Sequence, residues 1–253
     1  MSLQNVTNPF DNSGAAERYS LGRPAFHGLI LERLRPYLRG NELGADVACG
    51  TGLSSVALAE LVSEVRAYEI SGAMLAHALP HPRVAYAQAA AESLPLPDNV
   101  LDVLTVAQAF HWFDRQAFLQ EARRTLKSSG VLALYDDFFV GEMGGQPTFT
   151  AFAKAYFARY PAPARHREPF GEADAQAAGF SFTESRWQHP LKMTKSQLLA
   201  YLLTHSNIAA ATEAGTPPSE ITAWLEAELA PFYETNAEQE IMFSALLTVC
   251  QPL

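Results

Sequence analysis

The chain has 253 residues, with 18 basic and 27 acidic side chains, a formal net charge of −9, and 48% hydrophobic and 11% aromatic residues. This composition is typical of a folded globular protein and excludes disordered, collagen-like and coiled-coil chains. A chain of about 250 residues buries roughly three quarters of its exposable surface, so it can form a large core without disulfides. Net acidity without a basic run argues against nucleic-acid binding, because Lys and Arg supply most of that affinity.

The cysteines and the first residues indicate where the protein works. Cys49 and Cys250 lie far apart in the sequence, with no CxxC or His-rich spacing, which argues against a disulfide framework and a structural zinc site. The N-terminal residues do not resemble a signal peptide, and no run approaches the ~18 apolar residues of a membrane span. We therefore expect a cytoplasmic protein with no membrane segment and no metal, whose partner is a small molecule.

The first half of the chain alternates helical and strand-like segments. Apolar residues recur at helical spacing from Phe26 to Leu38, between Pro24 and Gly40, and predict one amphipathic helix. Such alternation predicts a parallel sheet with helical crossovers. The expected strands cover residues 45–48, 65–70, 84–87, 100–107 and 131–135, and the expected helices cover residues 53–61, 72–79 and 115–126, the last capped by Asp114.

The alternation weakens after about residue 140. The expected helices there cover residues 149–160, 172–178, 196–203 and 218–229, and strand-like runs cover residues 180–188 and 240–249. We find no internal repeat and no low-complexity tract in this half of the sequence.

A glycine-containing turn follows the first predicted strand. Gly50 and Gly52 would let a ligand approach backbone N–H groups, although a purely structural tight turn is the alternative for these glycines alone. Glu69 ends the next strand, where a carboxylate can accept both hydroxyls of a ribose. The dinucleotide fingerprint GxGxxG requires a third glycine where this chain has Ser55, so a nicotinamide dinucleotide is disfavoured.

Several motifs taken together resemble the class I S-adenosylmethionine-dependent methyltransferases of type 11. The matching stretches are residues 46–52 (first motif), 69–71 with 74–75 (second motif), and 91–98 followed by 101–104 (the AExLPxPD loop and the fourth strand). Residues 18–24 and 108–113 are similar to the trans-aconitate methyltransferase-like branch. The chain departs from the usual first motif at Ala48, where glycine is more common.

The resemblance implies an α/β, Rossmann-like class I methyltransferase fold. It would have a seven-stranded, mostly parallel sheet with helices on both faces and a helical lid. The chain would form one domain over residues 1–253, with a cofactor-binding core at about 40–140 and lid and substrate-binding additions at 1–38 and about 141–235. Both a monomer and a homodimer remain open.

The implied function is methyl transfer from S-adenosylmethionine to a small-molecule acceptor, with S-adenosylhomocysteine as the product. A carboxylate of an organic acid is a candidate acceptor. Two alternatives stay open: a non-catalytic S-adenosylmethionine-binding interaction protein and, less favoured, a nicotinamide-dependent oxidoreductase.

The resemblance also implies a cofactor site. Its glycines would face the amino-acid end of the cofactor, Glu69 the ribose and Ile70 the adenine, while Arg23 would pair with a carboxylate of the cofactor or of the acceptor. The full set is Arg23, Asp46, Ala48, Gly50, Gly52, Glu69, Ile70, Met74, Ala91, Glu92 and Gln108.

His111 lies beyond the carboxyl end of a buried strand, where ligands gather in open sheets. An imidazole titrates near neutrality, so His111 is a candidate general base, with pocket lining and structural packing as alternatives. Asp136 and Asp137 are expected to end the fifth strand as solvated caps. The substrate-binding candidates are Tyr19, Trp112, Tyr135, His205 and Ser206.

Overall fold

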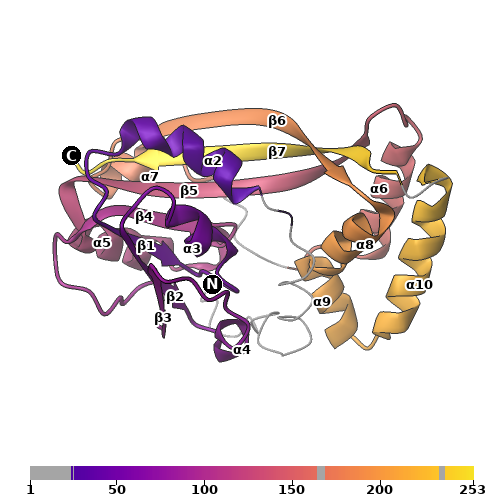
Figure 1. Cartoon of the computed structure of the whole chain (residues 1–253), viewed down its shortest axis with the longest axis horizontal. Helices are drawn as coiled ribbons and strands as arrows, with labels where there is room; N and C mark the ends of the chain where they lie inside the picture. Colours follow the sequence, from indigo (N-terminus) through magenta and orange to yellow (C-terminus); the bar gives the residue numbers. More distant parts are fainter. Residues whose placement is uncertain (1–23, 25, 164–168, 234–236) are drawn as a thin grey trace. The chain divides into compact units, whose positions relative to one another are not determined.

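A computed structural model of the protein describes residues 24, 26–163, 169–233 and 237–253. The chain divides into two compact units, each built from separate stretches of sequence (Figure 1). Of the described residues, the sheet unit comprises 26–138, 169–189 and 243–253, and the helical unit comprises 24, 139–163, 190–233 and 237–242. The single domain and the lid expected from the sequence stay predictions.

The strands are β1 (Leu43–Val47), β2 (Glu64–Glu69), β3 (Val84–Gln88), β4 (Leu101–Ala107), β5 (Leu126–Met143), β6 (Thr183–Met193) and β7 (Gln239–Cys250). Within the described residues they form one seven-stranded sheet in the order β3-β2-β1-β4-β5-β7-β6. β1 pairs in parallel with β2 and β4, β2 with β3, and β4 with β5. The strand order therefore reverses between β1 and β4, and ligands of open α/β sheets bind outside the carboxyl ends of the strands at such a point.

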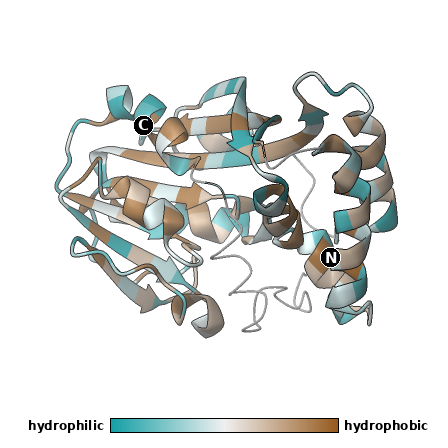
Figure 2. Cartoon of the chain, turned by 45° about the vertical axis from the view of Figure 1, so that its right-hand side comes forward, coloured by the Kyte–Doolittle hydropathy of each residue, from teal (hydrophilic) through white to brown (hydrophobic). Residues whose placement is uncertain are grey.

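The centre of the sheet unit is apolar. Every residue from Leu101 to Val106 is buried, which fits a parallel strand covered on both faces. Side chains of β1, β4, β5 and α5 (Arg115–Thr125) join in one hydrophobic cluster, and Figure 2 shows hydrophobic residues along the strands of this unit. The sequence predicted this buried strand and its neighbours.

The last strands differ from the rest in direction and length. The N–H of Gly144, just past β5, donates to the carbonyl of Glu240 at the start of β7 (2.8 Å), so these two strands run antiparallel. β5 continues to Met143, whereas the sequence predicts a strand that ends at residue 135. Asp136 and Asp137 therefore lie within the strand, and the expectation that they end it was wrong.

Helices of the sheet unit follow the predicted pattern with shorter bounds. Asp114 caps α5 by accepting the N–H of Ala117 (3.1 Å), as the sequence predicted. The first helix stops at Leu34, because Pro36 cannot continue it. The other helical segments are α2 (His27–Leu34), η1 (Arg35–Tyr37), α3 (Leu53–Leu58), α4 (Gly72–Leu75), η2 (Phe110–Trp112) and α7 (Glu172–Ala177).

The helical unit contains α6 (Phe149–Arg159), α8 (Lys195–Leu203), α9 (Ser206–Glu213), α10 (Pro218–Leu229) and η3 (Ala230–Phe232). Its interior is aromatic: the rings of Phe149 and Phe152 lie 5.1 Å apart, and those of Tyr160 and Trp224 lie 5.6 Å apart. The sequence predicted three of these helices but not α9, whose alanine-rich sequence gives little apolar periodicity.

Both cysteines are buried free thiols. Burial raises the pKa of Cys250 to about 12, and burial together with the nearby Asp46 and Glu69 also raises the pKa of Cys49. Protonated thiols are poor nucleophiles, so neither cysteine is suited to covalent chemistry. Over the described residues, the helices are all too short or too polar to cross a lipid bilayer.

Candidate functional site

The turn between β1 and α3 has an unusual backbone. Ala48, Gly50 and Gly52 have φ angles of 56°, 56° and 84°, in the left-handed region that favours glycine. A Cβ on Gly52 would collide with the ring and hydroxyl of Tyr86, so both the conformation and the space require glycine there. Ala48 adopts the same region with a side chain, which costs of order 1 kcal/mol. The turn is thus held in a strained shape, and its central residues, Gly50 to Gly52, are buried.

The buried carboxylate of Asp46 links the residues on either side of the turn. Asp46 has no exposed surface, and its oxygens accept hydrogen bonds from the hydroxyls of Ser54 (2.6 Å), Ser55 (2.6 Å) and Thr105 (2.9 Å). Burial raises the pKa of Asp46, and the three hydroxyl donors oppose that rise. Asp46 therefore ties β1, α3 and β4 together next to the turn, and its predicted place in the cofactor site stays a prediction.

Glu69 links the end of β2 to the same turn. One carboxylate oxygen accepts the N–H of Gly50 and the other accepts the N–H of Ser71, each at 2.9 Å. The side chain is 7% exposed, so its position is fixed. A carboxylate offers about four lone-pair sites, and two remain after these bonds. The sequence indicated Glu69 as a hydroxyl acceptor, but it did not indicate that the carboxylate also holds Gly50.

Apolar side chains lie next to this carboxylate. Ile70 follows Glu69 directly and is 59% exposed, although it is large and hydrophobic. Met74 lies in α4, which is capped by Ser71 through the N–H of Met74 (3.2 Å), and is buried. An exposed isoleucine beside a fixed acceptor is suited to covering a flat apolar group.

The β3–β4 loop (residues 89–100) leaves the sheet at the same edge. Its first N–H, at Ala89, donates to the carbonyl of Glu69 (3.1 Å). Ala91 is buried in the core of the sheet unit. Glu92 is half-buried and accepts the N–H of Asp114 (3.1 Å), just beyond the end of β4. The beginning of this loop therefore spans from Glu69 to the residues after β4.

The segment after β4 carries Gln108, His111 and Trp112. Gln108 has a φ of 56°, its N–H donates to the carbonyl of Tyr135 (2.8 Å), and its side-chain amide donates to the carbonyl of Asp137 (2.6 Å). His111 and Trp112 are half-buried in η2, with ring centroids 4.9 Å apart and tilted by 46°. This segment is thus anchored to β5 and brings an imidazole and an indole to the carboxyl end of β4.

The carboxyl-terminal part of β5 holds two polar pairs. Tyr135 is buried, with its hydroxyl 3.0 Å from Nδ1 of His27. Oδ1 of Asp137 lies 2.9 Å from Nε2 of His189 in β6. Asp137 is only 3% exposed, so it is not the solvated strand-end carboxylate that the sequence indicated. Nothing in the sequence points to His189, because its partner lies 52 residues away.

His205 and Ser206 lie in the helical unit. The hydroxyl of Tyr156 is 3.0 Å from Nδ1 of His205, and it donates to the side-chain oxygen of Asn207 at 3.3 Å. Ser206 is the first residue of α9 and is half-buried. Their predicted role in substrate binding stays a prediction, and Tyr19 and Arg23 lie outside the described residues.

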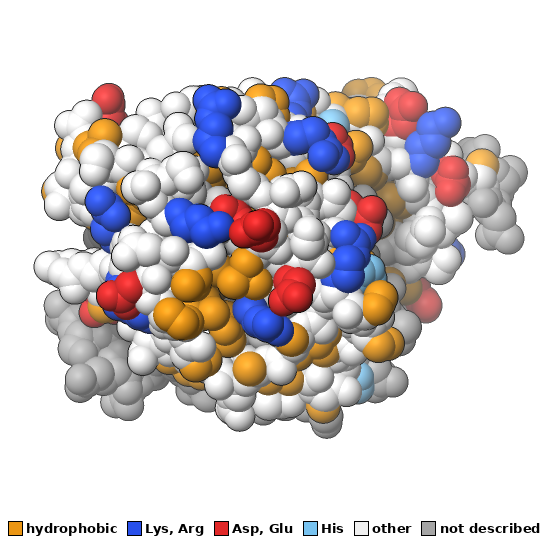
Figure 3. All heavy atoms as spheres, turned by 60° about the vertical axis from the view of Figure 1, so that its left-hand side comes forward, with side chains coloured by type: hydrophobic (Ala, Val, Ile, Leu, Met, Phe, Trp, Pro, Cys, Tyr) orange, Lys and Arg blue, Asp and Glu red, His pale blue; other side chains and the backbone are white. Residues whose placement is uncertain are grey.

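Charge is mixed on the one face of the molecule that Figure 3 draws. Positive and negative side chains are interspersed there. Within the described residues there is no group of three or more His, Cys, Asp or Glu that could hold a metal ion.

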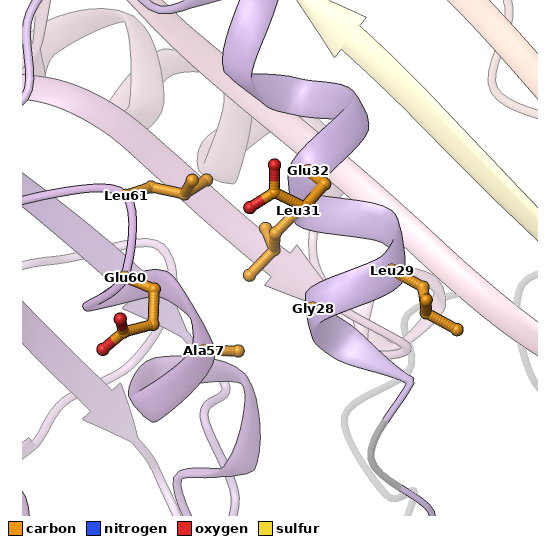
Figure 4. Close-up of a pocket in the computed structure, with 7 residues that line it drawn as sticks. All are labelled: Gly28, Leu29, Leu31, Glu32, Ala57, Glu60 and Leu61. Carbon is orange, nitrogen blue, oxygen red and sulfur yellow. The ribbon is translucent and has the colours of Figure 1, made fainter.

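A hollow of about 300 Å³ lies in the sheet unit, away from the turn. Figure 4 shows residues of α2, such as Leu31, facing residues of α3 and the segment after it, such as Ala57 and Leu61. Its remaining lining residues are Gly28, Leu29, Glu32 and Glu60. None of these belongs to the turn, to Glu69 or to the segment after β4, so this hollow is not part of the candidate site.

The same part of the chain matches a known protein family. Residues 45–134 match the family described as "Methyltransferase domain". This range begins in β1 and ends in β5, and it contains the turn, Glu69, the β3–β4 loop and His111.

Individual proteins are similar over longer stretches. A Dictyostelium discoideum protein named as a methyltransferase is 28% identical over 178 residues, 69% of this chain and 68% of that protein. A Mycobacterium tuberculosis protein named as an S-adenosylmethionine-dependent methyltransferase is 32% identical over 108 residues, 42% of this chain and 39% of that protein. A solved structure from Anaeromyxobacter dehalogenans, named as a type II methyltransferase, is 26% identical with a TM-score of 0.68 and covers 89% of this chain and 95% of its own.

These matches and the seven-stranded sheet agree. The chain carries a methyltransferase domain of the class I, Rossmann-like fold, an enzyme domain whose methyl donor is S-adenosylmethionine. The trans-aconitate branch is a finer assignment that remains a prediction.

Proposed function

We propose that this chain uses its methyltransferase domain to transfer the methyl group of S-adenosylmethionine to a small-molecule acceptor, with a carboxylate of an organic acid as the leading candidate. The observation that carries the proposal is the position of Glu69. Its carboxylate is fixed by the N–H groups of Gly50 and Ser71 at the edge where the strand order reverses, and it can still accept two hydroxyls.

The residues at this edge fit a sulfonium nucleoside. Glu69 supplies an acceptor for the ribose, and the exposed Ile70 supplies an apolar surface for the adenine. Within the described residues, the buried hydroxyl of Thr51 has no hydrogen-bond partner, so this group of the turn can still form a hydrogen bond. Gly50 and Gly52 let a charged amino-acid group approach the backbone, and Glu92 would meet the polar edge of the adenine. The hydrogen-bond acceptors at this edge are oxygens, which suit the donors of a cofactor: the hydroxyls of its ribose and its amino group.

The chain's own contribution to the reaction is alignment. When bound, S-adenosylmethionine supplies a methyl group on a positively charged sulfur, which departs as a neutral thioether once the acceptor atom bonds to the methyl carbon. The protein holds the acceptor in line with that bond, at about 3 Å, and excludes water. A carboxylate acceptor needs no base, because the charge is neutralised in the reaction.

A hydroxyl or amine acceptor would also release a proton. His111 is then the candidate general base, since η2 places its imidazole directly after β4. Trp112, Tyr135, His205 and Ser206 remain candidates for binding the acceptor. The mixed charge on the face that Figure 3 draws and the net charge of −9 support a small acceptor over a nucleic acid.

Calorimetric titration of the full chain tests the cofactor assignment. We expect S-adenosylmethionine and S-adenosylhomocysteine to bind and NAD to give no heat. Binding of NAD in place of S-adenosylmethionine would favour the oxidoreductase alternative and overturn the proposal.

A metabolite screen tests the transfer itself. The purified protein, S-adenosylmethionine and a mixture of small organic acids, amines and alcohols are incubated, and products are sought at 14 mass units above an acceptor. An acceptor methylated by this protein and not by its Glu69→Ala variant supports the proposal. Tight cofactor binding without any methylated product across these classes would support the non-catalytic alternative.

A further inference from the structure

The β3–β4 loop has one anchor at its cofactor end and a second, stronger anchor at its far end. At the first, Ala89 bonds the carbonyl of Glu69 and Glu92 accepts from Asp114. At the second, the loop meets the last turn of α5, where it contacts Arg124 and Glu121. The second anchor belongs to neither the turn nor the segment after β4.

Every N–H donor of the Arg124 side chain has an acceptor. Nη1 donates to the carbonyl of Leu96 (2.8 Å) and to Asp98 (2.6 Å), and Nη2 donates to the carbonyl of Leu94 (3.2 Å). The remaining donors of Nε and Nη2 bind both oxygens of Glu121, at 2.8 and 2.7 Å. A guanidinium carries five N–H donors in a fixed plane, and all five are used here.

Glu121 completes the arrangement from the opposite side. Its Oε1 also accepts the N–H of Leu94 (2.6 Å), so Arg124 and Glu121 together bind both backbone groups of that residue. Glu121 is 11% exposed, and the hydrogen bonds from Arg124 hold the pKa of its carboxyl below the usual range despite burial. The pair therefore stays ionised at neutral pH, and it forms hydrogen bonds to backbone groups of the loop at residues 94 and 96.

The position of Leu94 determines the position of the residues before it. Ser93 closes a turn by donating to the carbonyl of Ala90 (3.2 Å), so residues 90–94 form one short, connected unit. Leu94 and Ala91 are both buried in the same core cluster. A shift of Leu94 would therefore move Ala91 and Glu92 relative to Glu69.

We propose that Arg124 is a positioning residue for adenine recognition: with Glu121 it fixes residues 94–98, and through them it sets Ala91 and Glu92 against the purine's six-position. This inference rests on the proposed cofactor site. Arg124 acts through the loop: besides its side-chain bonds, its backbone carbonyl accepts the N–H of Asn99, just before β4 begins.

The test compares two ligands that differ only at that edge of the purine, at the six-position and in the proton that the 6-oxo form carries on N1. S-adenosylhomocysteine carries an amino group there, and S-inosylhomocysteine carries an oxygen. Dissociation constants for both are measured by calorimetry with the unaltered protein, with Arg124→Lys, and with Arg83→Lys as the matched control. Lysine cannot reproduce five planar donors. Arg83 also binds a backbone carbonyl and a carboxylate, at Val62 and Glu60, but it does not touch the loop.

We expect Arg124→Lys to weaken S-adenosylhomocysteine binding roughly three- to tenfold, as loss of about one hydrogen bond would. Binding of S-inosylhomocysteine should change less, so the preference for the amino ligand should shrink. Arg83→Lys should leave the preference unchanged. A role limited to stability would alter thermal unfolding but not the preference between the two ligands.

Asp98→Asn is the second variant, because Asp98 is largely exposed and its replacement is not expected to prevent folding. It should reduce the preference in the same direction, by a smaller factor. An unchanged preference in both folded variants would overturn the inference while leaving the proposed function intact. Failure of the unaltered protein to bind S-adenosylhomocysteine would overturn both.

Discussion

Replacing Glu69 by alanine removes the acceptor on which the proposed cofactor site depends. In the folded protein the carboxylate holds two backbone N–H groups at 2.9 Å, from Gly50 and Ser71. With the cofactor bound, the same carboxylate would also accept hydroxyls of the ribose. The substitution therefore has two separable effects, one on the turn and one on binding.

The magnitudes follow from the number and type of bonds lost. A hydrogen bond to a charged group contributes about 1.5–3 kcal/mol. Loss of the ribose acceptor should thus weaken cofactor binding by about 1.5–3 kcal/mol, or roughly 10- to 150-fold in the dissociation constant. The effect on unfolding should be about 1–3 kcal/mol, because the substitution leaves the N–H groups of the buried residues Gly50 and Ser71 without their acceptor.

Calorimetric titration with S-adenosylhomocysteine and urea denaturation measure the two effects on the same samples. Glu64→Ala is the control, because Glu64 begins the same strand and is exposed in a salt bridge with Arg66. It should change neither quantity appreciably. If Glu69→Ala remains folded and binds S-adenosylhomocysteine as tightly as the unaltered protein, the ribose assignment is wrong.

Three further substitutions test the structure of the sheet unit. Gly52→Ala should cost about 2–4 kcal/mol of stability in urea denaturation and weaken S-adenosylhomocysteine binding at least about tenfold, because φ is +84° and the new methyl group meets Tyr86. Asp102→Asn should lower stability by about 1–2 kcal/mol at pH 7 and by progressively less as the pH falls below about 4. His189→Leu should cost about 1–3 kcal/mol, since it removes a donor from the buried carboxylate of Asp137.

The pH dependence of the second variant follows from the charge on Asp102. Burial alone would raise the pKa of this carboxyl, but Lys127 and the N–H groups of Leu43 and Glu42 outweigh burial and lower it. A lowered pKa in the folded state adds stability above the unfolded value, and that stability disappears as the pH falls through the folded value. Equal differences between the two proteins at pH 7 and pH 3 would contradict this assignment.

Controls for the other two variants come from the same unit. Gly28→Ala should be neutral or stabilising by up to about 1 kcal/mol, because nothing lies near the added methyl group in α2. If Gly28→Ala lowered stability as much as Gly52→Ala, the protein would be destabilised by a methyl group added to any glycine, and the result would say nothing specific about the turn. For His189→Leu, a double-mutant cycle with Asp137→Asn measures the interaction energy of the two side chains. If the losses in the free energy of unfolding were strictly additive, the two side chains would not be coupled.

Local sequence was sufficient for much of the sheet unit. The run from Leu101 to Val106 is continuously buried because both faces of a central parallel strand are covered, and this is visible as an apolar run in the sequence. Asp114 caps α5 through Ala117, three residues away, which is a contact between near neighbours. Glu69 ends β2 and Gly52 precedes α3 in the turn after β1, where spacing along the chain alone indicates their position.

Contacts between distant residues could not be predicted in the same way. Asp137 pairs with His189, and Arg124 reaches back to Leu94 and Leu96, across separations of 52, 30 and 28 residues. No periodicity links such positions. The sequence by itself therefore determined most of the segments that become strands and helices, because those depend on neighbours in the chain, but it missed α9 and the second half of β5. Only the tertiary structure decided which side chain satisfies which buried partner, since that depends on how the strands are ordered in space.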